Sequence, residues 1–77
     1  KGIKEGLREE YHPNSLLAEI ASYKNGLLSG KYKSFHINGL IKEKGIYING
    51  QKDGVWSYHN QMGRIIRKEK WYKGALK

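Results

Sequence analysis

The sequence predicts an all-β protein in which tandem β-hairpins form an elongated, twisted, single-layer antiparallel sheet of about six strands. Nine of the ten glycines lie on one register with a period of 24 residues, which is the signature of a repeat protein. Asn-Gly dipeptides, which favour tight hairpin turns, recur in this register. Short stretches rich in Ile, Val, Tyr, Phe and Trp lie between the turns, and these residues favour strands.

Glycine and aromatic columns define the repeat units. The first glycine column contains Gly2, Gly26, Gly50 and Gly74, the second contains Gly6, Gly30 and Gly54, and the third contains Gly39 and Gly63. An aromatic column precedes the first glycine column and contains Tyr23, Tyr47 and Trp71. Gly45 alone lies outside the register. We therefore expect residues 1–77 to form one repeat array with the units 2–25, 26–49 and 50–73.

Each unit is expected to run strand, turn, strand, loop. The six predicted strands are 7–12, 16–24, 31–37, 40–48, 55–59 and 64–73. The Gly-x-x-x-Gly segments 26–30 and 50–54 are predicted loops, because the second of them encloses the polar residues Gln51-Lys52-Asp53. A helix over 14–23, capped by Asn14 or Ser15, is the one competing interpretation. A strand is favoured there because the equivalent segments of the other units carry β-type residues.

The first and third units depart from the common pattern. In unit one, Arg8 stands at the position of an aromatic residue, and Pro13 enters beside Asn14-Ser15. Proline removes a ladder donor and suits an outer hairpin turn. In unit three, Tyr58 arrives one residue early and Met62 replaces the turn asparagine, which predicts a local bulge or a shifted turn.

Composition bounds the class of protein. The 77 residues carry a net charge of +8 and no cysteine, so disulfides and thiol chemistry are excluded. No apolar run approaches the ~18–20 residues of a membrane span, and no signal peptide is visible. A cytoplasmic or membrane-peripheral location is favoured. Because the chain begins without methionine and Gly2 and Gly74 share one phase, we expect it to be a segment of a longer array.

The repeat resembles a known family. Unit three reads Asp53-Gly54-Val55-Trp56-Ser57-Tyr58, and unit two reads Gly30-Lys31-Tyr32-Lys33-Ser34-Phe35 before Asn38-Gly39. These motifs are similar to the MORN repeat, in the variant form of bacterial antitoxin-like MORN-repeat proteins. The resemblance implies stacked β-hairpins that act as scaffolds for protein contacts, with attachment to acidic phospholipid in some members. Some relatives carry a lipid-kinase name, but this chain has no phosphate-binding glycine loop, no His-Arg-Asp and no Asp-Phe-Gly motif.

Histidines and carboxylates are the candidates for chemistry. His12 and His36 share a repeat position and His59 lies one place earlier, so neighbours would be two strands, or about 9–10 Å, apart. Zinc holds its ligand nitrogens at ~2.0–2.1 Å, so we expect exposed histidines and no metal site. The acidic residues are expected to be structural, with Glu43 paired across strands to Arg67. The other members of this set are Glu5, Glu9, Glu10 and Glu19. No catalytic residue and no cofactor are predicted.

The candidate contact surface combines aromatic and basic residues. Tyr32 and Trp56 share a column with Arg8, so both rings are expected to be partly exposed and available to a partner. Period two places four lysines on one face of the strands. These lysines are Lys42, Lys44, Lys68 and Lys70. The basic face is interpreted either as a solvated guard of edge strands or as a binding surface.

The resulting functional hypothesis is a non-enzymatic interaction or scaffolding module with a protein partner. The first alternative is peripheral binding of acidic phospholipid through the lysine-rich face. A toxin-neutralising role and contact with a nucleic-acid backbone are further alternatives, since a basic stripe with aromatics permits the latter. Edge-to-edge self-association is a further way in which an open sheet of this kind can form contacts.

Overall fold

A computed structural model describes residues 5–77, so Gly2 of the first glycine column lies outside the described residues. All regular structure in this range is β. The strands are β1 Gly6–Tyr11, β2 Leu17–Lys24, β3 Leu27–Leu28, β4 Gly30–Phe35, β5 Ile41–Ile48, β6 Gln51–His59, β7 Ile65–Tyr72 and β8 Ala75–Leu76. The all-β prediction is confirmed, and each of the six predicted strands corresponds to a long strand of the structure.

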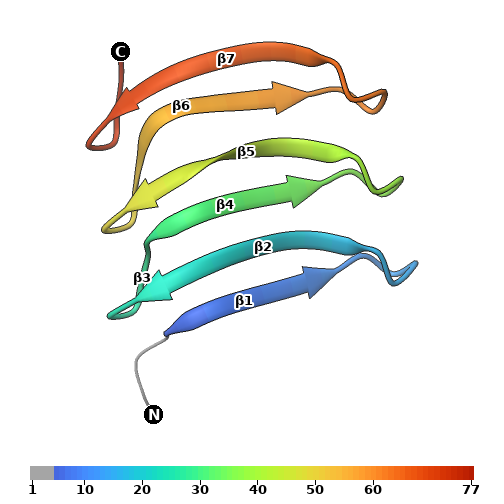
Figure 1. Ribbon diagram of the computed structural model, residues 1–77, viewed down its shortest axis with the longest axis horizontal. Coiled ribbons are helices and arrows are strands. Elements are labelled where there is room, and N and C mark those ends of the chain that lie inside the picture. The colour runs from blue at the N-terminus through green and yellow to red at the C-terminus, as the bar shows by residue number, and fades with distance from the viewer. Residues whose placement is uncertain (1–4) are drawn as a thin grey trace.

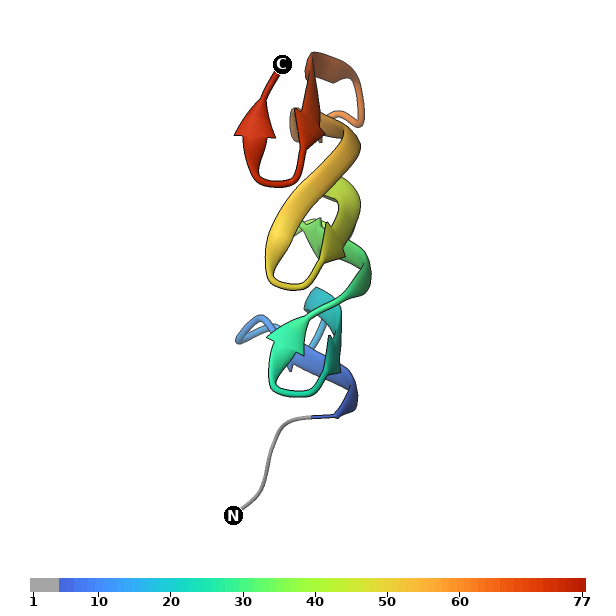
Figure 2. The ribbon, with the colours of Figure 1, turned by 90° about the vertical axis from the view of Figure 1, so that its left-hand side faces the viewer.

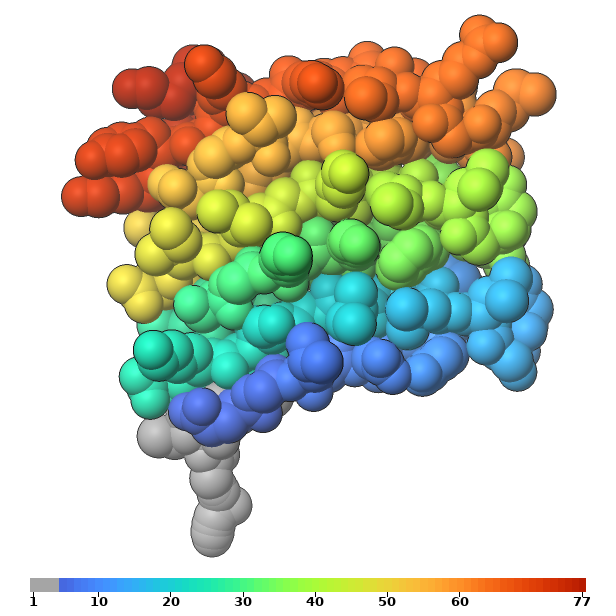
Figure 3. All heavy atoms as spheres, viewed as in Figure 1, coloured from blue at the N-terminus to red at the C-terminus, as the bar shows by residue number. Residues whose placement is uncertain are grey.

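The strands form one antiparallel sheet in which the chain adds hairpins in sequence order. The order across the sheet is β1-β2-β4-β5-β6-β7-β8, with β3 also paired to β2 (Figure 1). The sheet is twisted and measures 37 × 34 × 11 Å, so three hairpins give a nearly square single layer (Figure 2). Figure 3 shows the hairpins stacked one on the next along the chain. Both faces of the layer are therefore available for contact.

Two-residue turns close one end of the sheet. In the turn after β5, Asn49 has φ 50° and Gly50 has φ 82°. Positive φ at both central residues defines a type I′ turn, whose twist matches that of the flanking strands. Asn25-Gly26 and Lys73-Gly74 repeat this geometry. Tight Asn-Gly turns are thus confirmed at Asn25-Gly26 and Asn49-Gly50, whereas Asn38-Gly39, also expected in a tight turn, lies in a longer loop.

Five-residue loops close the other end. The amide of Gly39 donates to the carbonyl of His36 over 2.9 Å, and the amide of His36 donates to the carbonyl of Leu40 over 2.8 Å. Because His36 pairs with Leu40, residues 37–39 form a three-residue turn within the five-residue loop. Gly39, with φ 92°, is the left-handed residue that ends this turn. The side-chain oxygen of Asn38 accepts from the amide of Leu40. Equivalent loops start at His12 and at Asn60.

The third loop has the predicted bulge but not the alternative, a shifted turn. Its turn is not shifted, because Asn60 supplies the oxygen that Asn38 supplies in unit two and accepts from the amides of Met62 and Arg64. The register does shift between Tyr58 and His59. The same shift occurs in the other two units, so this bulge is a feature of the repeat.

The two Gly-x-x-x-Gly segments also differ from prediction. Residues 27–28 form the short strand β3, and Gln51 and Lys52 begin β6, where loops were predicted. The reason lies in the type I′ turn, which places the residues after it directly opposite the strand before it. Leu27 therefore pairs with Lys24, and Gln51 pairs with Ile48.

Trp56 is the centre of a thin core. Its side chain is 0% exposed, and it is the one large side chain buried to this degree in the part of the chain that the structure describes. Gly45 on β5 lies against it, since a Cβ at Gly45 would lie 2.2 Å from the indole ring. Ala21, the equivalent residue one repeat earlier, is also fully buried. Gly45 therefore leaves the repeat register in order to make room for the ring.

Gly54→Val is expected to destabilise the sheet. Gly54 has φ +75°, while the nearest atoms to a Cβ there would be those of Ile46 at 3.8 Å, so the backbone and not crowding sets the cost. A β-branched residue in this conformation costs about 1–3 kcal/mol. In a domain of this size the melting temperature should fall by about 4–8 °C for each kcal/mol. Gly54→Asn is the control, because asparagine already adopts positive φ at Asn49, and it should cost less. A Gly54→Val melting temperature equal to that of the wild type would contradict the assigned conformation.

Candidate functional site

One face of the sheet carries a group of lysines, and we call it the lysine face. Across the strands, Lys33 is opposite Lys44, Lys44 is opposite Ser57, and Ser57 is opposite Lys68. Directly opposed residues project from the same face of a sheet. By the same pairing Lys31 lies opposite Ile46, and Lys70 lies opposite Val55. The lysine face therefore holds Lys31, Lys33, Lys44, Lys68 and Lys70.

Exposed aliphatic side chains lie among these lysines. A shallow hollow is lined by Lys44 and Lys68 together with Ile46, Val55 and Ile65. Each of these three aliphatic residues is exposed. A second hollow is lined by Leu7 and Ile20 beside Lys31 and Lys33. The face thus combines positive charge with uncovered apolar surface.

Lys42 lies apart from this group, which corrects the prediction that four lysines share one face. The sheet register shifts between Ser34 and Phe35, opposite the segment that contains Lys42. Lys42 lines a separate hollow with Tyr58 and Arg67. Tyr58 and Arg67 belong to the other side of the sheet, which carries the aromatic rings. Strict alternation fails at Lys42 because the bulge inserts one extra residue into the strand.

The opposite face carries a cluster of aromatic residues, and we call it the aromatic face. Tyr32, Tyr47 and Trp56 form a cluster with ring centroids 5.0–5.5 Å apart. The indole nitrogen of Trp56 donates to the carbonyl of Ile46 over 3.0 Å. Burial raises the pKa of the Tyr32 and Tyr47 phenols. Tyr32 is half-buried, but Trp56 is fully buried, so the expectation that the Trp56 ring is partly exposed is wrong.

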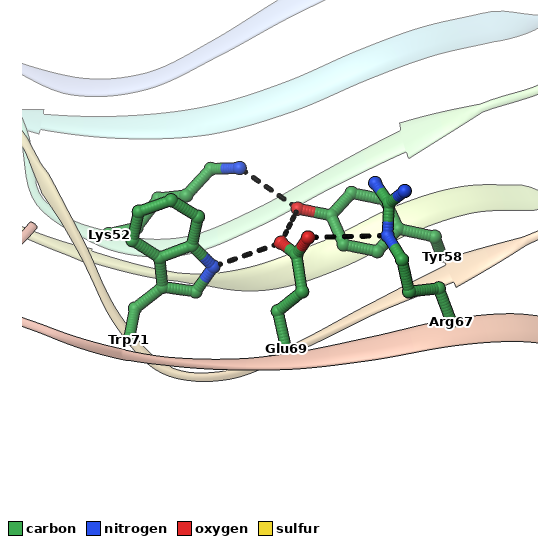
Figure 4. A network of polar contacts seen from close by, with 5 residues as sticks. All are labelled: Lys52, Tyr58, Arg67, Glu69 and Trp71. Carbon is green, nitrogen blue, oxygen red and sulfur yellow. Dashed lines mark hydrogen bonds and ion pairs between the residues drawn. The ribbon is translucent and has the colours of Figure 1, made fainter. Parts of the chain in front are cut away.

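A lysine ammonium sits among the rings beside this cluster. The Nζ atom of Lys52 lies 4.6 Å from the centroid of the Trp56 ring, 4.9 Å from that of Trp71 and 5.5 Å from that of Tyr58. Lys52 donates to the Tyr58 hydroxyl over 2.9 Å (Figure 4). An aromatic cage of this kind attracts cations. Here the protein's own ammonium occupies it, so the cage serves the fold.

Glu69 anchors the other side of this network. It accepts from the Tyr58 hydroxyl over 2.9 Å and from the Trp71 indole over 3.1 Å (Figure 4). The Tyr58 hydrogen bond is the main reason that the pKa of Glu69 lies below its ordinary value. Burial lowers the pKa of the Lys52 ammonium, but the hydrogen bond to Tyr58 and nearby charges outweigh this effect and raise it.

The predicted pairing of Glu43 with Arg67 is corrected. The guanidinium Nε of Arg67 lies 3.2 Å from Glu69, and the guanidinium stacks over the Tyr58 ring at 4.5 Å. Glu43 is opposite Tyr58, and Tyr58 is opposite Arg67, so the strand β6 separates the two. Arg67 is thus held by an acid on its own strand.

The histidines are half-buried, so the expectation of exposed histidines is wrong, and His12 and His36 have a structural role that sequence reasoning missed. His12 donates from Nε2 to the carbonyl of Phe35 over 2.9 Å, and His36 donates to that of His59 over 2.8 Å. Asn14 and Asn38 make parallel bonds to the carbonyls of Ile37 and Gln61. Each donor and acceptor are 23 residues apart, so every bond links one hairpin loop to the next. The recurrence of His and Asn at 24-residue spacing was the available signal.

The arrangement offers contact surfaces and not an enclosed reaction chamber. Within residues 5–77, no cluster of three or more His, Asp or Glu side chains could hold a metal ion. The same range contains no helix that could cross a bilayer.

No family model matches the chain, and neither a curated protein nor a solved structure matches it.

Proposed function

We propose that this chain is a non-enzymatic interaction module, built of repeats that resemble MORN repeats, which binds an acidic phospholipid surface through its lysine face. The observation that carries the proposal is the combination of five lysines and exposed aliphatic residues on one side of a single-layer sheet. A sheet 11 Å thick can lie flat on a surface, so all five ammonium groups can approach it together.

The composition of the face favours an anionic surface over a protein partner. Interfaces between proteins are depleted in lysine and enriched in aromatic residues. The lysine face has the opposite character, because it holds five lysines while the clustered rings of Tyr32, Tyr47 and Trp56 lie on the other side of the sheet. Basic residues near an acidic bilayer each contribute about 1 kcal/mol of attraction. The exposed side chains of Ile46, Val55 and Ile65 would add shallow apolar contact with the lipid.

The separation of rings from lysines also disfavours nucleic acid. Proteins that bind single strands stack bases on aromatic side chains beside a basic groove. Here Trp56 is buried, and Tyr32 and Tyr47 pack against it on the aromatic face. On the side of the lysines, Tyr72 at the end of β7 is exposed, but the clustered rings are on the other face, so the lysines would meet phosphates without a row of rings on which to stack bases.

Replacing Lys44 and Lys68 by glutamine is expected to weaken binding to acidic vesicles about 30-fold. The estimate follows from about 1 kcal/mol for each lysine and a factor of ten for each ~1.4 kcal/mol. The measurement is co-sedimentation with vesicles that contain or lack phosphatidylserine. Wild-type binding should require the acidic lipid and should weaken as salt rises and the screening length falls.

A matched double variant provides the control. Lys42→Gln with Arg64→Gln removes the same charge from a bulge and a hairpin loop, outside the lysine face. It should bind more tightly than the Lys44→Gln, Lys68→Gln variant. Equal loss in both pairs would reduce the effect to net charge and contradict a defined face. Binding that does not depend on lipid charge and salt would also contradict the proposal.

A further inference from the structure

The two outer edges of the sheet carry complementary charges. Strand β1 contains Arg8, Glu9 and Glu10, and strand β7 contains Arg67-Lys68-Glu69. Every residue of β1 is exposed. Among residues 5–77, β1 pairs only with β2, and on its outer side β7 pairs only with the short strand β8 at Trp71 and Tyr72 and accepts the amide of Lys77 at the carbonyl of Lys70. Within this range, the backbone groups beside these charged side chains therefore have no strand partner on the outer side of either strand.

The internal junctions between hairpins define how a further strand would pair. Where β2 meets β4, Glu19 is opposite Ser34 and Ile20 is opposite Lys33. Where β5 meets β6, the residues 24 positions later pair in the same way, with Glu43 opposite Tyr58 and Lys44 opposite Ser57. The register of a junction between hairpins is thus constant.

Applying this register to the outer edges places β1 of a second copy against β7. Arg67 and Lys68 occupy the positions of Glu43 and Lys44. Glu10 and Glu9 occupy, one repeat earlier, the positions of Ser34 and Lys33. The junction would therefore place Glu10 opposite Arg67, Glu9 opposite Lys68 and, one step on, Arg8 opposite Glu69. All three facing pairs have opposite charge, and neither internal junction has such a set.

From this match we infer that the protein associates head to tail, with strand β1 of one copy extending the sheet at strand β7 of the next. The residues at which the outer units depart from the repeat are the ones that match. Arg8 replaces the aromatic residue of the other units, and Glu69 replaces the small residue, Ala21 or Gly45, that faces it. The contact joins two different surfaces, so it generates an open array unless its rotation closes.

The charges are already arranged for such a contact. Arg8 is paired with Glu10 on β1, and Arg67 is paired with Glu69 on β7, each two residues apart on one side of its strand. When the strands meet, the four groups alternate in sign across and along the junction. Exposed ion pairs of this kind contribute little stability by themselves, so they do not prevent either strand from pairing with a partner strand.

Symmetric pairing of identical edges is less favourable. Two β1 strands centred on Glu9 would place Glu9 against Glu9, and two β7 strands centred on Lys68 would place Lys68 against Lys68. Like charges directly opposite each other destabilise a sheet. The size of the assembly therefore distinguishes the two modes: head-to-tail contact permits growth beyond a dimer, whereas symmetric pairing of one edge stops at a dimer.

Sedimentation velocity of the whole chain tests the inference independently of lipid binding. The wild type should rise from the monomer mass of 8.9 kDa past the dimer as concentration increases, and should return toward monomer in high salt. Glu9→Lys with Glu10→Lys should abolish growth, as should Arg67→Glu with Lys68→Glu. An equimolar mixture of the two double variants should associate again, because each junction in the mixture can match opposite charges.

A control variant separates the edge from net charge. Lys42→Glu with Lys44→Glu changes the charge as much as Arg67→Glu with Lys68→Glu does, but on the internal strand β5, and it should associate like the wild type. Circular dichroism confirms that each variant is folded. The inference is overturned if the wild type stays monomeric at every concentration, stops at a dimer, or if the mixture fails to associate.

Discussion

Trp56→Ala is expected to lower the free energy of unfolding by about 3–5 kcal/mol, the usual cost of removing a buried tryptophan. A chain of this length has a total stability of about 4–12 kcal/mol, at about 0.05–0.15 kcal/mol per residue. We expect the full cost at Trp56, because Tyr32, Tyr47 and the Lys52 ammonium all pack on its ring. Urea unfolding, followed by far-ultraviolet circular dichroism, measures the change.

Trp71→Ala is the matched comparison. Trp71 lies on the same face but is half-buried near the edge of the sheet, so its removal should cost clearly less than that of Trp56. Equal losses for the two variants would contradict the assignment of Trp56 as the centre of the core. The stability of Trp56→Phe should lie between those of the wild type and Trp56→Ala, because it keeps an aromatic ring but loses the indole donor to Ile46.

Gly45→Ala is expected to destabilise the sheet by about 1–3 kcal/mol, the range for an overfilled core. The added methyl group would lie 2.2–2.5 Å from three atoms of the Trp56 indole. The ring cannot turn away easily, since Tyr32 and Tyr47 flank it. A substitution of glycine by alanine in a strand would otherwise stabilise slightly, so the sign of the change is diagnostic.

A second substitution should partly rescue this variant. Ala21 and Tyr32 occupy the positions of Gly45 and Trp56 one repeat earlier, and Ala21 is buried. Gly45→Ala combined with Trp56→Tyr reproduces that pair. The double variant should lose less stability than the sum of its two single variants, and a purely additive loss would contradict direct contact between the two positions.

The fold was largely predictable because its signals are local and repeated. The glycine register and the β-type stretches recur in every unit, and Asn-Gly turns recur at Asn25-Gly26 and Asn49-Gly50, so the three copies agree on one architecture. The short strands β3 and β8 were missed because the residues after a type I′ turn pair whatever their side chains. Leu27 and Ala75 give no strand signal of their own, and the backbone of the turn places them.

The contact surface was only partly predictable because it depends on which residues oppose each other. Strict alternation grouped Lys42 with Lys44, but the bulge in the register separates them. The column of Tyr32 and Trp56 indicated exposure, since Arg8 shares it, yet Gly45 lets the Trp56 ring sink onto strand β5. Predicting the contact between Gly45 and Trp56 requires the register between strands β5 and β6, and the periodicity along one strand does not give this register.

The lysine face can be tested against the aromatic face in a single experiment, because the chain has no native cysteine to interfere. A polarity-sensitive fluorophore is attached through Val55→Cys on the lysine face or, separately, through Glu10→Cys on the aromatic face. Emission is recorded with vesicles that contain or lack phosphatidylserine. The proposed function predicts a blue shift at position 55 with acidic vesicles alone and no shift at position 10. Equal shifts at both positions, or none at position 55, would contradict docking through the lysine face.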